Sequence, residues 1–150
     1  MSDQRARPFV LGPGEGEPLN LRGAEMRIKA SARTGGGAFS FIESRDPSGF
    51  AATTHIHHEA VEAFYLLEGD YVFYVGAGET QLGPGSFVLV PKGIRHGYRL
   101  AAEHGRILII YAPAGIELFW QELEKLVREG RLTPELRSQL ARDMLATEFL

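Results

Sequence analysis

The chain has 150 residues, no cysteine and a formal net charge of -3 at pH 7. This length predicts a single domain with a sizeable core, and the lack of cysteine excludes disulfides, thiolate metal sites and cysteine nucleophiles. The slight negative charge, with no block rich in lysine and arginine, argues against nucleic acid and anionic membranes as partners. The N-terminal MSDQRARPF lacks the apolar run of a signal peptide, so we expect a cytoplasmic protein.

The first 49 residues predict short strands separated by turns. Residues 1–7 are polar and are expected to be mobile, and residues 8–11 predict a peripheral strand. Residues 24–30 and 37–43 alternate polar and apolar side chains around a glycine run, which predicts a hairpin. The segment SRDPSG, which ends at Gly49, is predicted to be a loop.

The stretch from Gly49 to Gly69, GFAATTHIHHEAVEAFYLLEG, concentrates potential metal ligands. In an extended strand, residues two apart point to the same face, so His55 and His57 face inward together. An apolar run begins directly after Glu62, which predicts a carboxylate on the neighbouring antiparallel strand. Two imidazoles and a carboxylate suit one divalent transition metal ion, such as iron, manganese, nickel, copper, cobalt or zinc.

Other polar residues offer alternatives to this site. An isolated His-x-His pair is more often solvated than bound to metal. Glu59 competes with Glu62 as the carboxylate, whereas His58 points to the opposite strand face and His104 lies in a polar loop. Residues 85–96 then supply a strand, a turn with proline and glycine, and His96 as a fourth inward-facing ligand.

The second half of the chain predicts more strands and then helices. Residues 71–76 and 79–83 predict a hairpin, and residues 86–90, 96–100 and 106–112 predict further strands of an antiparallel sandwich or barrel. After Pro113 the apolar spacing becomes helical. Gly130 fits the end of one helix, and Thr133 followed by Pro134 fits the start of a second. We expect the barrel over residues 8–113 and a helical extension over 115–150, packed on the barrel or on a second subunit.

Two spaced runs of residues resemble the two motifs of the cupin superfamily. They are Gly49, His55, His57, Glu62 and Gly69 in the first run and Gly85, Pro91, Gly93 and His96 in the second. Leu100 stands where the second motif often ends in asparagine, which is not a metal ligand in the family. The chain looks most similar to small single-domain cupins of the quercetin 2,3-dioxygenase type.

The resemblance implies a fold, a ligand set and an assembly. The fold would be all-β, an antiparallel cupin β-barrel (a double-stranded β-helix of jelly-roll type), followed here by the α-helical pair. One metal ion would bind the three histidines and the glutamate of the two motifs: His55, His57, Glu62 and His96. Similar cupins often form homodimers, so a homodimer is expected.

The ligand count predicts chemistry at the metal. Four protein ligands leave one or two positions free on a metal that prefers five or six. The first hypothesis is a metal-dependent dioxygenase acting on a small organic substrate, quercetin-like or diketone-like, with Glu62 also accepting the substrate proton. A metal-dependent isomerase or lyase is the alternative, and a non-catalytic metal-dependent binding protein for small molecules is another.

Aromatic residues near the ligands are candidates for the walls of a substrate pocket. Phe64 and Tyr98 follow Glu62 and His96 at same-face spacing, and Phe73 is a third candidate. For each of them, packing in the core is the alternative to lining an apolar cavity.

Overall fold

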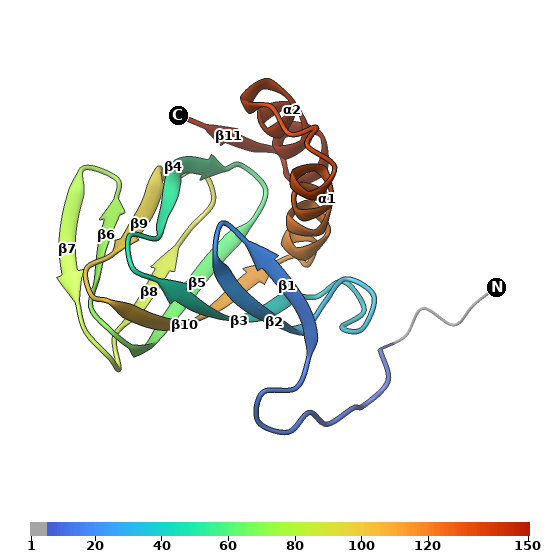
Figure 1. Cartoon of the computed structure of the whole chain (residues 1–150), viewed down its shortest axis with the longest axis horizontal. Coiled ribbons are helices and arrows are strands. Elements are labelled where there is room, and N and C mark those ends of the chain that lie inside the picture. Colours follow the sequence, from blue (N-terminus) through green and yellow to red (C-terminus); the bar gives the residue numbers. More distant parts are fainter. Residues whose placement is uncertain (1–5) are drawn as a thin grey trace.

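The computed structural model describes residues 6–150, so residues 1–5 of the polar segment expected to be mobile lie outside it. The strands form two antiparallel sheets around one core, with the helices at one end (Figure 1). The six-stranded sheet has the order β1 (Glu17–Leu21), β2 (Ala24–Ala30), β3 (Ser40–Pro47), β10 (His104–Ala112), β5 (Val61–Glu68) and β8 (Phe87–Val90). The five-stranded sheet has the order β11 (Thr147–Phe149), β4 (Ala51–His57), β9 (His96–Leu100), β6 (Tyr71–Val75) and β7 (Gly78–Leu82).

This architecture confirms the all-β cupin fold with two C-terminal helices. The predicted hairpins are β2–β3 and β6–β7, and the strands predicted over 86–112 are β8, β9 and β10. Gly69 shows why a glycine is needed between β5 and β6. Its φ is 79°, and a Cβ atom there would collide with the carbonyl oxygen of His104.

Two predictions near the N-terminus are wrong. Residues 8–11 form no strand, and residues 44–47 belong to β3 and not to a loop. Strand β1 was not predicted. Two polar residues of the segment 44–47, Ser44 and Asp46, are buried, whereas Arg45 between them is exposed. Asp46 is buried and accepts hydrogen bonds from Ser44 at 2.5 Å and Tyr71 at 2.7 Å, so a polar sequence there is compatible with a strand.

The C-terminal extension contains α1 (Ile116–Arg128), α2 (Pro134–Leu145) and β11. Thr133 caps α2 as predicted, since its hydroxyl accepts from the Leu136 N–H at 3.1 Å. The expectation of a wholly helical extension is wrong, because the chain turns at Ala146, with φ of 47°, and pairs as β11 with the edge of β4. Among the described residues, no helix is long and apolar enough to cross a bilayer.

Candidate metal centre

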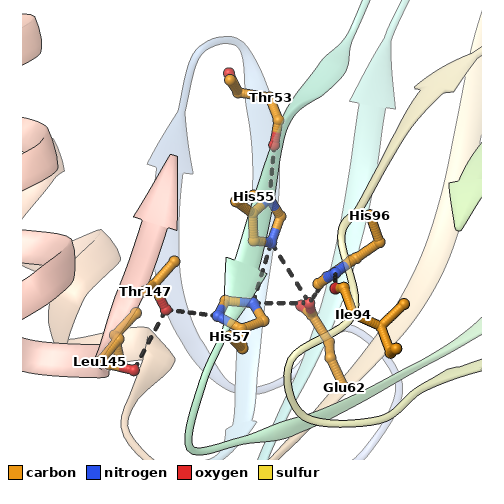
Figure 2. A network of polar contacts seen from close by, with 8 residues as sticks. All are labelled: Thr53, His55, His57, Glu62, Ile94, His96, Leu145 and Thr147. Carbon is orange, nitrogen blue, oxygen red and sulfur yellow. Dashed lines mark hydrogen bonds and ion pairs between the residues drawn. The ribbon is translucent and has the colours of Figure 1, made fainter. Parts of the chain in front are cut away.

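The four predicted ligands meet between the two sheets (Figure 2). His55 and His57 lie on β4, and His96 at the start of β9 pairs with His55 in the strand register. Glu62 lies on β5, which belongs to the other sheet. The prediction that Glu62 occupies the strand next to β4 is therefore wrong. The turn at residues 58–60 carries the chain between the sheets, and the carboxylate reaches the histidines across the interior.

Each of these side chains directs one ligand atom at a common centre. Oε2 of Glu62 lies 2.9 Å from Nε2 of His96, 3.0 Å from Nε2 of His57 and 3.8 Å from Nε2 of His55. The Nε2 atoms of His55 and His57 are 3.0 Å apart, and all four ligand atoms lie within 4.8 Å of one another. His57, Glu62 and His96 are buried and His55 is partly buried, so bulk water does not compete freely for these atoms.

The opposite ring nitrogens fix the tautomers of two histidines. Nδ1 of His55 lies 2.6 Å from the carbonyl oxygen of Thr53, and Nδ1 of His96 lies 2.9 Å from that of Ile94. A carbonyl oxygen can only accept, so each Nδ1 carries a proton and donates. In the neutral ring, Nε2 then presents a bare lone pair to the centre of the cluster.

A threonine from the C-terminal strand does the same for the third histidine. Nδ1 of His57 lies 2.6 Å from Oγ1 of Thr147, and the Thr147 hydroxyl donates to the carbonyl oxygen of Leu145 at 3.3 Å. With its hydrogen used in this way, Oγ1 accepts from Nδ1 of His57 and leaves Nε2 unprotonated. No pattern in the sequence signals this role, because Thr147 lies 90 residues from His57 and in no recognisable motif.

The cluster fits a divalent transition metal ion. Three imidazole lone pairs converge with a carboxylate oxygen, and lone pairs 3.0 Å apart repel unless positive charge lies between them. Imidazole nitrogen with carboxylate oxygen is a donor set that binds zinc, iron, manganese, nickel, cobalt or copper. The residues that would hold the ion are the four that were predicted: His55, His57, Glu62 and His96.

Ionisation of the cluster suits the same role. Burial by itself raises the pKa of Glu62. In the metal-free cluster, hydrogen bonds from imidazoles that carry a proton on Nε2 outweigh burial and hold that pKa well below its usual range, so the side chain is a carboxylate. Burial lowers the pKa of His57, which favours the neutral ring that ligates metals. For His96, burial acts in the same direction, but the contact with Glu62 outweighs it and raises the pKa, so a proton competes with a metal ion there.

Comparison with known proteins identifies the family. Residues 41–111 match the family model described as "Cupin domain". The chain contains a cupin domain. This cupin is 35% identical over 119 residues to the quercetin 2,3-dioxygenase of Bacillus subtilis. The matched residues make up 79% of this chain and 35% of that protein. It therefore spans about a third of the length of that relative.

Solved structures show the same fold. KdgF from a Halomonas species has a TM-score of 0.65 at 15% identity, over 73% of the cupin and 99% of that chain. An RmlC-like cupin from Shewanella frigidimarina has a TM-score of 0.64 at 18% identity, over 77% of the cupin and 98% of that chain. At such identities the likeness concerns the fold and not the activity.

The competing residues lie outside the metal cluster. Glu59 and His58 are exposed, and His58 contacts Glu148 of β11 at 3.3 Å. His104 is also exposed. Leu100, at the position where the motif often has asparagine, is buried in the core of the cupin.

A cavity of about 140 Å³ adjoins the cluster. Tyr98 lines this cavity, as do His55, His57 and Glu62. Phe64 and Phe73 do not border it. They are buried behind Tyr98, with ring centres 5.4 and 5.2 Å from its ring, so the core-packing alternative describes them.

The C-terminal extension supplies much of the cavity wall, which the sequence did not predict. Helix α1 contributes apolar side chains that include Phe119, Trp120 and Leu123, and β11 contributes Phe149. Arg137 of α2 also lines the cavity. The extension was expected to pack on the outside of the barrel or on a second subunit. Its side chains instead line the cavity that adjoins the metal cluster.

Proposed function

We propose that this cupin is a metal-dependent dioxygenase that acts on a small organic substrate with an enolisable carbonyl, either quercetin-like or diketone-like. The observation that carries the proposal is the convergence of three imidazole nitrogens and one carboxylate oxygen beside an apolar cavity. The 35% identity to a quercetin 2,3-dioxygenase over most of the chain supports this choice among cupin activities.

Glu62 is the group that moves a proton. Among the described residues that line the cavity it is the only carboxylate, and the surrounding imidazoles keep it ionised. It accepts the proton that an enolisable substrate loses and returns it to the product. When bound, a divalent transition metal supplies Lewis acidity and redox chemistry at this site. The breaking carbon–carbon bond provides the electrons that reduce dioxygen, and both oxygen atoms enter the products, so no external reductant is needed.

Tyr98 and the apolar walls orient the substrate. Burial, together with the charges of Asp46 and Glu62, raises the pKa of Tyr98 well above its usual value, so its hydroxyl stays protonated. It therefore acts as a hydrogen-bond donor towards a substrate oxygen and not as a base. Phe50 and Phe119 bring apolar surface to the cavity and keep water from the reacting carbons.

The test combines metal analysis with oxygen uptake. Protein purified without a histidine tag or chelator is analysed for metals, and oxygen consumption is measured with quercetin and with pentane-2,4-dione. We expect about one equivalent of metal, oxygen uptake with one of the two compounds, and loss of uptake in Glu62→Gln. His104→Ala, which changes an exposed histidine, is the control and should behave as wild type.

Other outcomes separate the alternatives. Stoichiometric metal with no oxygen uptake would move the assignment to a metal-dependent isomerase or lyase, or to a non-catalytic binding protein. Failure to bind any metal after reconstitution would overturn the metal site itself. A homodimer and a cytoplasmic location stay predictions.

A further inference from the structure

The cavity beside the metal cluster contains two positive charges among apolar side chains. Its charged lining residues are Arg22, Arg137 and Glu62, together with the histidines of the cluster. Glu62 is engaged by the imidazoles at 2.9 to 3.8 Å and does not balance the arginines. A metal ion in the cluster would make the cavity still more positive.

Arg137 has an unsatisfied donor in this cavity. Its Cζ atom lies 4.3 Å from the ring centre of Phe149, and its Nε is buried without a hydrogen-bond partner. Within residues 6–150 it is the one buried side-chain polar atom in this condition, and no carboxylate of that range lies within 4.0 Å of the guanidinium. Burial, with repulsion from Arg22, lowers the pKa of Arg137. Arg137 is partly buried and Arg22 is exposed at the mouth of the cavity. The buried Nε of Arg137 has lost water without gaining an acceptor, so the site favours an anion that supplies one.

Arg22 comes from the turn between β1 and β2 and is held in place on two sides. Its Nη2 donates to the carbonyl oxygen of Ala51 at 2.5 Å, and its Cζ lies 5.4 Å from the ring centre of Phe50. The backbone of Arg22 has a φ of 51°, which is uncommon for a residue other than glycine. The guanidinium groups of Arg22 and Arg137 thus lie against aromatic rings and line one cavity, although the two residues are far apart in the sequence.

We propose that the cavity takes a small carboxylic acid, whose carboxylate binds the guanidinium groups of Arg137 and Arg22 and whose carbonyl oxygens face the metal cluster. This inference rests on the proposed function and names its substrate class. A planar guanidinium matches a carboxylate with two parallel hydrogen bonds. The volume of about 140 Å³ is many times the space that one water needs, so a small organic acid with an apolar body suits it.

A matched pair of probes tests the charge. The metal-loaded protein is titrated calorimetrically, without oxygen, with 2,4-dioxopentanoate and with its methyl ester, which differ in the carboxylate charge. We expect the acid to bind about 10- to 100-fold more tightly than the ester. Arg137→Met replaces the arginine by an unbranched, uncharged side chain, so it should abolish most of the preference for the acid. Arg142→Met is the control, because Arg142 lies on the same helix but is exposed and contacts Gln139.

The outcomes distinguish this inference from the proposed function. The carboxylate site is overturned if wild type binds acid and ester with equal affinity, or if Arg137→Met keeps the preference for the acid. In that case a bound metal and oxygen uptake would still support the proposed function. If wild type binds no metal, the proposed function fails, and the acid–ester comparison is made on the metal-free protein. If Arg137→Met does not fold, Arg22→Met tests the same preference.

Discussion

The cupin domain and the C-terminal extension contribute to the site in different ways. All four candidate ligands lie within residues 41–111, the part that matches the family. Thr147, Arg137 and the aromatic wall from α1 lie outside that range, in residues 115–150. The difference indicates that the shared domain supplies the candidate metal ligands, whereas the extension orients His57 and lines the adjoining cavity.

The extension is attached to the domain at both of its ends. At its start, the carboxylate of Glu117 is buried and accepts hydrogen bonds from the Ala32 N–H at 2.6 Å and from the Ser40 hydroxyl. At its end, β11 pairs with β4 along the three residues that include both motif histidines. These attachments explain how a segment outside the matched domain is held against the metal cluster.

The largest effect is expected from His57→Ala, which removes a ligand of the shared domain. The protein should lose stoichiometric metal while keeping its strand content, because the core of the barrel does not depend on the cluster. Elemental analysis and circular dichroism measure the two quantities. His58→Ala, one residue further along but exposed, should keep the metal. Full metal content in His57→Ala would remove this histidine from the site.

Glu117→Ala tests whether the extension depends on its first attachment. The buried Ser40 hydroxyl and the partly buried Ala32 N–H both lose their acceptor, so we expect the free energy of unfolding to fall by about 3 kcal/mol. Urea denaturation measures it. Glu124→Ala on the same helix removes a contact with the Asn20 N–H at 2.8 Å in an exposed setting, and it should cost less than about 1 kcal/mol. Equal costs for the two variants would show that Glu117 is no special anchor.

Thr147→Val tests the reach of the extension into the metal site. Valine keeps the shape of threonine but cannot accept from Nδ1 of His57, so metal affinity should fall about 10- to 100-fold. Competition with a chromogenic chelator gives the dissociation constant. Thr147→Ser retains the hydroxyl and should restore most of the affinity. A valine variant with wild-type affinity would confine the metal site to the shared domain.

The sequence predicted the ligands better than the surroundings of the site. The spacing of His55, His57, Glu62 and His96 is local to two strand–turn segments, and such short-range patterns can be recognised directly. The sequence could not show that Glu62 reaches the histidines from the opposite sheet, because the order of strands in a sheet depends on long-range pairing. Thr147 and Arg137 were missed for a related reason. Their roles arise only when β11 and α2 fold back onto the barrel, which no local periodicity encodes.

The smallest effect is expected at Asp46, which is buried inside the barrel. Its hydrogen-bond partners, Ser44 and Tyr71, belong neither to the metal ligands nor to the extension. Burial raises the pKa of Asp46, although hydrogen bonds from Ser44 and Tyr71 oppose this shift. The folded protein therefore holds this proton more tightly than the unfolded chain, whose aspartate pKa is about 3.9. The resulting stability is complete below about pH 4 and is lost as the pH rises through the folded pKa.

Asp46→Asn cannot titrate, so its free energy of unfolding should rise relative to wild type across that pH range and stay level above it. The size of this pH-dependent rise equals the stability that wild type loses as Asp46 ionises. Urea denaturation of both metal-free proteins from about pH 4 to about pH 8 measures the difference, and the histidines of the metal site cancel because both proteins contain them. A difference that does not vary with pH would mean that Asp46 has the same pKa in the folded and unfolded protein. Unchanged metal affinity in Asp46→Asn would separate the stability of the barrel interior from the metal site that the extension supports.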